Sequence, residues 1–191
     1  MTEESSPDRE QYPRPNPSFD PRMLAVIAVM TAIVLLLTYV VRVPTPAKGY
    51  AHLGDTGVFF GAFAFGPIVG AIAGGLGTAL SDLLAGYFQY APVTLVIHGL
   101  EGLVAGSIAW RVRGLAGLIL AAVAGGIIVV GGYFLYEVVL TGVGAALGEV
   151  VPNILQVSIG ALIAIPLYTA IRLAYPPITK LREQWRWPGR K

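Results

Sequence analysis

The strongest constraint on this chain is a run of 19 residues without a charged side chain, from Met23 to Val41. A helix of that length can cross the hydrocarbon core of a bilayer, which requires ~20 mostly apolar residues. Five further apolar segments follow it, and charged residues make up only 13% of the chain. Soluble domains carry about 25% charged residues. We therefore predict an integral membrane protein.

These segments predict an all-α integral membrane protein that forms a bundle of six transmembrane helices. The predicted helices are Met23–Val43, Leu53–Phe65, Pro67–Tyr87, Pro92–Trp110, Leu115–Leu140 and Glu149–Tyr175. The second helix is short for a core of about 30 Å, so we expect it to begin in the preceding loop or to pack irregularly. Residues 1–22 are predicted to form a disordered tail, residues 23–175 the membrane domain and residues 176–191 a basic tail.

The distribution of basic residues predicts the orientation in the membrane. Six spans place both termini and the Arg111–Gly114 turn on one side, which carries eleven Lys and Arg residues. The other side carries two, Arg42 and Lys48. By the positive-inside rule both termini are predicted to be cytoplasmic. Because the net charge is only +2 and the basic residues lie at the predicted membrane edges, no nucleic-acid partner is expected.

The polar side chains of the predicted helices gather in the outer half of the membrane. They are Asp55, Asp82, His98, Glu101, Glu137, Asn153 and Gln156. Ionisable groups within a bilayer are costly and commonly functional, so this asymmetry predicts a pocket that opens outward and is closed below. His98 and Glu101 are candidate binding residues, as are Glu137, Asn153 and Gln156. Among the outer tyrosines, Tyr90 and Tyr133 are candidates to stack on a flat ligand. The alternative is that these groups only satisfy one another between helices.

Several other kinds of site are not expected. Without cysteine, the chain has no disulfides and no cysteine-ligated metal. His52 and His98 lack a third ligand at metal spacing, so no metal site is predicted. Asp55-Thr56-Gly57 spells an aspartic protease triplet, but the second carboxylate motif is missing. The glycine-rich stretches lack the ending of a phosphate-binding loop, so we interpret them as helix-packing sites. No cofactor is predicted.

A recognisable pattern spans residues 50 to 106. It consists of the stretches Tyr50–Asp55, Phe65–Pro67, Gly70–Gly77, Ala79–Tyr87 and Tyr90–Gly102. This pattern resembles the substrate-binding (S) component of energy-coupling-factor (ECF) vitamin transporters. The resemblance is to the branch related to hydroxymethylpyrimidine/thiamine and riboflavin S components.

The resemblance implies a function and a set of partners. S components are six-helix proteins of the prokaryotic plasma membrane that capture a vitamin at the outer face. They associate with a transmembrane coupling protein and two cytoplasmic ATPase subunits. In many members an Ala-x-x-x-Ala patch on the first helix contacts the coupling protein, and Ala28 and Ala32 match that pattern. Asp55 and Asp82 lie within the recognisable motif, where a structural role is expected. The family's ligand contacts come mainly from the first outer loop and helices four to six.

Three functional hypotheses follow. The first is an S component, not an enzyme, for a small water-soluble vitamin. Thiamine or its hydroxymethylpyrimidine precursor is the preferred ligand because Glu101 and Glu137 supply acceptors and the pocket lacks Lys and Arg; riboflavin remains open. The second is an intramembrane enzyme that uses Asp82, His98 and Glu101 as acid and base. The third is a structural membrane subunit without a ligand.

Overall fold

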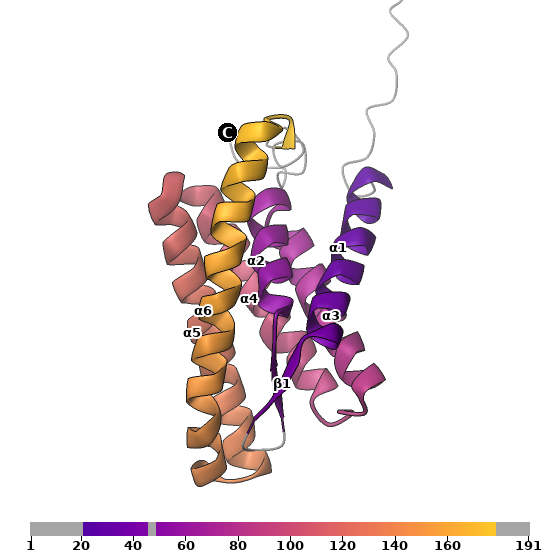
Figure 1. Cartoon of the computed structure of the whole chain (residues 1–191), viewed down its shortest axis with the longest axis vertical. Helices are drawn as coiled ribbons and strands as arrows, with labels where there is room; N and C mark the ends of the chain where they lie inside the picture. Colours follow the sequence, from indigo (N-terminus) through magenta and orange to yellow (C-terminus); the bar gives the residue numbers. More distant parts are fainter. Residues whose placement is uncertain (1–20, 46–48, 179–191) are drawn as a thin grey trace, which may run out of the picture.

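The computed structural model describes residues 21–45 and 49–178 of the chain. Most of the two predicted tails, 1–22 and 176–191, lies outside these residues. The elements in chain order are α1 (Pro21–Val40), β1 (Arg42–Pro44), β2 (Tyr50–His52), α2 (Gly54–Phe65), α3 (Pro67–Ala85), α4 (Ala91–Arg111), α5 (Gly114–Leu140) and α6 (Val143–Ala174). The predicted all-α architecture with six helices is confirmed. Figure 1 shows that α1 begins and α6 finishes at the same end of the bundle.

Five of the six helices are long and apolar enough to cross a membrane. The exception is α2, whose 12 residues extend only about 18 Å at 1.5 Å per residue. The antiparallel hairpin of β1 and β2 precedes it and projects toward the opposite end of the bundle from the start of α1 (Figure 1). The sequence predicts a loop at Pro44–His52 instead of this hairpin, because two three-residue strands have too few residues to show an alternating pattern.

The start of α6 was predicted wrongly. The helix begins at Val143, six residues before the predicted Glu149, and contains Pro152 and Pro166 in its interior. Its true boundary is the turn after α5, where Gly142 has a φ of 92°, a conformation that favours glycine. Asn153 and Gln156 are consequently the eleventh and fourteenth residues of α6 and do not lie in its first two turns.

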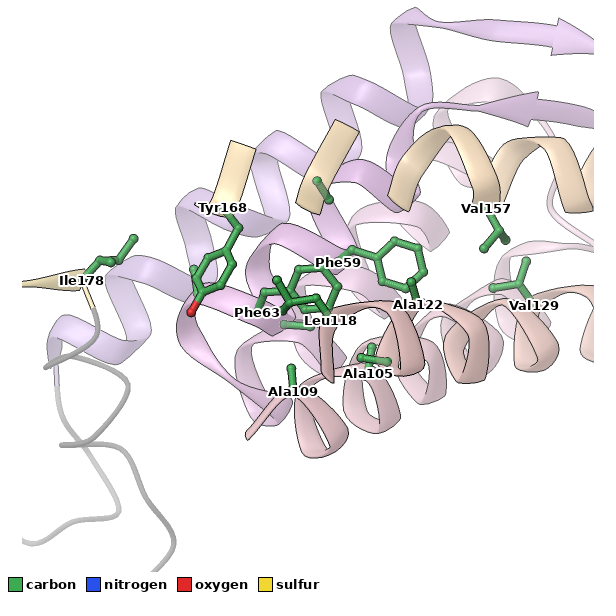
Figure 2. Close-up of a cluster of buried hydrophobic side chains, with 14 of the residues drawn as sticks. Phe59, Phe63, Ala105, Ala109, Leu118, Ala122, Val129, Val157, Tyr168 and Ile178 are labelled. Carbon is green, nitrogen blue, oxygen red and sulfur yellow. The ribbon is translucent and has the colours of Figure 1, made fainter. Parts of the chain in front are cut away.

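The helix α2 lies at the centre of the bundle. Ten of its 12 residues are buried, and it contacts α1, α3, α4 and α6. Phe59 and Phe63 extend from it into an apolar cluster that includes Ala105 of α4, Ala122 of α5 and residues of α6 (Figure 2). Burying each of these phenylalanines contributes roughly 1.5–3 kcal/mol. The short helix therefore holds the longer ones together.

Glycines bring α3 and α4 into close contact, as expected for helix-packing sites. A Cβ atom on Gly70 would lie 2.9 Å from both Ala62 Cα and the Gly102 carbonyl oxygen. A Cβ atom on Gly102 would overlap the backbone of Gly70. Small residues of this kind allow membrane helices to approach backbone to backbone. The crossing lies below the polar cavity and fixes how α4 presents its side chains.

Candidate functional site

The candidate site is a polar cavity at the hairpin end of the bundle, with a volume of about 40 Å³. It is formed by the hairpin and by the ends of α3, α4, α5 and α6 that lie near it. Its lining residues are Gly49, Tyr50, His52, Asp82, Tyr87, Tyr90, Thr94, Tyr133, Glu137, Glu149, Asn153 and Gln156. A cavity of this size holds roughly three water molecules.

Helical spacing aligns the lining side chains. Glu149, Asn153 and Gln156 follow one another at intervals of four and three residues, which places them on one face of α6. Tyr133 and Glu137 are four residues apart on α5. Residues three or four apart share one face of a helix, so these polar side chains of α5 and α6 face the same cavity.

Hydrogen bonds connect α4 and α5 across one wall of the cavity. The hydroxyl of Tyr90 donates to Glu137 Oε1 at 2.6 Å, and Thr141 Oγ1 donates to Glu137 Oε2 at 2.9 Å. The hydroxyls of Thr94 and Tyr133 lie 2.9 Å apart. Both carboxylate oxygens of Glu137 are therefore satisfied by the protein.

The cavity has an acidic lining. Asp82, Glu137 and Glu149 contribute carboxyl groups, and none of the lining residues that the structure describes is Lys or Arg. Burial, followed by the neighbouring Asp82 carboxylate, raises the pKa of Tyr50 above its usual range. Burial, followed by the charge of His98, lowers the pKa of His52 and favours its neutral form. The lining thus offers acceptors and negative charge to a ligand.

Gln156 connects three elements at the base of the cavity. Its Oε1 accepts a hydrogen bond from the backbone N–H of His52 at 3.0 Å. Its Nε2 donates to Asp55 Oδ2 at 3.1 Å. One amide from α6 therefore holds both the hairpin and the start of α2.

A second polar cluster lies behind the wall, outside the lining. His98 Nδ1 is 2.6 Å from Glu101 Oε2 and 3.4 Å from Asp55 Oδ1, and all three side chains are fully buried. None of these three residues lines the cavity, but Asp55 is hydrogen-bonded to Gln156, which does.

The structure brings together five of the seven predicted binding residues in the cavity lining: Tyr90, Tyr133, Glu137, Asn153 and Gln156. His98 and Glu101 lie in the buried cluster, and Asp82 lines the cavity while Asp55 does not. Glu149, Thr94 and His52 also line the cavity and were not among the predicted binding residues. Glu149 lies four residues before Asn153 and therefore on the same face of the helix, which could have identified it. It was overlooked because Glu149 was placed at the predicted start of the helix.

The contact between Tyr50 and Asp82 leads to a testable prediction. The Tyr50 hydroxyl donates to Asp82 Oδ1 at 2.6 Å and so ties the hairpin to α3. The Tyr50→Phe substitution leaves the buried carboxylate without this donor. It should lower the free energy of unfolding by about 1–3 kcal/mol, measured by denaturation of the detergent-solubilised protein.

Tyr87→Phe is the matched control for this substitution. The Tyr87 ring packs on Tyr50 with ring centroids 5.0 Å apart, and no hydrogen bond of its hydroxyl is seen among the described residues. Its removal should change stability by less than about 0.5 kcal/mol. Equal losses in the two variants would contradict a specific role for the bond to Asp82.

Comparisons with known proteins agree with this architecture. A solved structure of the S component of a bacterial ECF transporter superposes with a TM-score of 0.59 at 24% identity, covering 81% of this chain and 96% of that one. The fold is therefore that of an S component.

Two sequence relatives extend the comparison. An uncharacterized protein of Pyrococcus woesei is 40% identical over 68% of this chain and 88% of its own length. The thiamine precursor transporter HmpT of Lactococcus lactis subsp. cremoris is 32% identical over 75% of this chain and 83% of its own length.

The family assignment comes from a family model. The model of the S component of ECF-type riboflavin transporters matches residues 18–173, which include nearly all of the six helices. S components of this type bind small vitamins in the membrane and work with an ECF transmembrane and ATPase module, so the chain is a transport protein and not an enzyme. It belongs to the family of S components of ECF-type riboflavin transporters.

Proposed function

We propose that this S component captures thiamine or its hydroxymethylpyrimidine precursor for ATP-driven uptake. The observation that carries the proposal is the cavity lining, which combines three carboxyl groups with four tyrosines and lacks Lys and Arg among its described residues. Such a lining favours a flat, donor-rich or cationic ring compound over an anionic vitamin. The relative named as a thiamine precursor transporter supports the same ligand class.

In this proposal Glu137, Asn153 and Gln156 supply the polar contacts to the ligand, and Tyr90 and Tyr133 supply ring surfaces. His98 and Glu101 contribute from behind the wall by positioning Asp55, which in turn holds Gln156.

The proposed orientation places the cavity on the outer side. The excess of Lys and Arg at the opposite end of the bundle supports cytoplasmic termini in a prokaryotic plasma membrane. Ligand would enter from outside, and a coupling protein with two cytoplasmic ATPase subunits would drive release inside. We infer that Ala28 and Ala32 form the contact with the coupling protein.

Riboflavin is the second candidate because the matching family model describes riboflavin S components. Isothermal titration of the detergent-solubilised protein with hydroxymethylpyrimidine, thiamine, riboflavin and pantothenate separates the two. We expect saturable binding of a thiamine-class compound and none of pantothenate. Binding of riboflavin alone would overturn the ligand assignment but keep the transport class, whereas an empty response to every vitamin would favour a structural subunit.

The Glu137→Gln substitution tests the role of the acidic lining. It removes a charged acceptor from the cavity and should weaken binding of the thiamine-class ligand about 10–100-fold, since hydrogen bonds to charged groups contribute about 1.5–3 kcal/mol. Tyr136→Phe is the control, because this hydroxyl donates to the Gln89 carbonyl and does not line the cavity. Unchanged affinity in Glu137→Gln would contradict the proposed contact.

A further inference from the structure

The polar cluster behind the cavity wall extends to His52, a residue of the cavity lining, and so brings together side chains that are distant in the sequence. His52 of β2, Asp55 of α2 and His98 of α4 each offer one ligand atom, and these atoms all lie within 4.8 Å of one another. The two imidazole rings have centroids 5.4 Å apart. His98 and Asp55 are fully buried and His52 is 8% exposed. The expectation that no third ligand accompanies the two histidines is therefore wrong, because Asp55 lies beside them.

Several polar atoms of this cluster have no hydrogen-bond partner within the described part of the chain, although Asp55 Oδ1 lies 3.4 Å from His98 Nδ1. They are Asp55 Oδ1, His98 Nε2 and Glu101 Oε1. Buried polar atoms in native proteins nearly always have a partner, so three orphans in one cluster require an explanation. Among the described residues, the only ion-pair partner of the Asp55 and Glu101 carboxyl groups is His98, and no Lys or Arg pairs with them.

We propose that His52, Asp55 and His98 bind a divalent transition-metal ion such as Zn²⁺. Two imidazoles and one carboxylate are a ligand set that suits borderline divalent metals and leaves a coordination position open. The ion would satisfy the orphaned Asp55 Oδ1 and His98 Nε2.

Glu101 does not bind the ion in this proposal but contacts one of its ligands, His98. Its Oε2 is 2.6 Å from His98 Nδ1. In the tautomer that carries its proton on Nδ1, His98 donates to this carboxylate and the Nε2 lone pair is free to bind the ion. Metal-binding histidines commonly donate their second N–H to a carboxylate, which fixes the ring and its tautomer. His98 would therefore bind the ion, and Glu101, three residues further along α4, would hold the His98 ring in position.

Binding would require a small contraction of the cluster. Ligand atoms around a tetrahedral Zn²⁺ lie roughly 3.4 Å apart, because each is about 2.0–2.1 Å from the ion. His52 Nδ1 now accepts a hydrogen bond from the Gly54 N–H at 3.1 Å, and this lone pair would turn to the ion instead. Because His52 also lines the cavity, the cavity gives the ion a path of entry.

The ion would link the hairpin to α2 and α4 beneath the cavity. That role is independent of which vitamin is bound, since none of the vitamin contacts proposed above is a ligand of the ion. A metal that binds only the folded protein also stabilises it. We therefore expect added Zn²⁺ to raise the denaturation temperature of the chelator-treated protein.

The test uses the full chain, prepared without a histidine tag, solubilised in detergent and freed of metal with a chelator. Titration with CoCl₂ should give visible d–d absorption that saturates at one ion per chain and is bleached by equimolar ZnCl₂. Absence of a saturable cobalt spectrum, together with no heat of binding for ZnCl₂, would show that the cluster is a hydrogen-bonded network only and would overturn the proposal.

Variants assign the ligands. His98→Gln should lower cobalt affinity at least about 100-fold, and Glu101→Gln about 10–100-fold. Glu137→Gln is the control carboxylate variant and should keep the wild-type cobalt affinity, because Glu137 is outside the cluster. If His98→Gln does not fold, His52→Gln provides the same test. Wild-type affinity in either folded histidine variant would exclude this site, whatever the outcome of the vitamin titrations.

Discussion

Replacing both Ala28 and Ala32 with tryptophan is expected to abolish vitamin uptake by cells while leaving vitamin binding to the purified protein unchanged. Both alanines are exposed on α1, whereas Met30, Val34 and Thr38 of the same helix are buried against the bundle. Only 17% of this span is buried within the chain. Small residues on such a face allow a second helix to approach closely, and an indole ring at each position prevents that approach.

The two readouts separate a partner interface from a folding defect. Uptake is measured with radiolabelled vitamin in cells that carry the coupling module, and binding is measured by titration of the solubilised protein. Ile33→Trp is the control, since Ile33 is 39% exposed but lies about 140° around the helix from Ala28 and about 100° from Ala32. Normal uptake in the double variant would exclude this face as the interface. Loss of vitamin binding would instead indicate a damaged fold.

The Gly102→Ala substitution is expected to destabilise the membrane domain strongly, although it adds only one methyl group. The added Cβ would overlap the Gly70 backbone, which has no side-chain end that can move aside. Overpacking usually costs about 1–3 kcal/mol, and we expect a loss of at least about 3 kcal/mol because backbone must shift. The measurement is the denaturation temperature of the solubilised protein.

Gly99→Ala provides a matched control on the same helix. A Cβ there would lie 3.6 Å from the Ala71 carbonyl oxygen, an ordinary contact distance. Because alanine is also the better helix former, this variant should be as stable as the wild type or slightly more so. Equal losses in Gly99→Ala and Gly102→Ala would show that the α3–α4 crossing is not set by Gly102.

Helix positions were predictable because each depends on a local property. An apolar run of sufficient length must form a helix in lipid, where unpaired backbone groups are costly. The predicted bounds of α3, α4 and α5 differ from the observed ones by no more than two residues. The start of α6 was missed because the boundary lies at the Gly142 turn, six residues before Glu149, which leaves Pro152 inside the helix. Its interior position depends on packing against neighbouring helices.

The candidate site was predictable only in part, for a related reason. Glu137, Asn153 and Gln156 line one cavity as expected, although the residue count for α6 began six residues too late. Rotation of each helix about its axis is decided by contacts with other helices. His98 was therefore expected in the pocket but lies behind its wall, against Asp55 and Glu101.

The sequence alone predicts a membrane protein with six helices and contains the recognisable pattern of residues 50 to 106. These properties depend on local hydrophobicity and residue order. Only the tertiary structure placed His52 beside His98, 46 residues further along, and enclosed the acidic cavity under the hairpin. Such contacts arise when separate helices and strands pack, and their geometry is set by the close approach of backbones at positions such as Gly70 and Gly102.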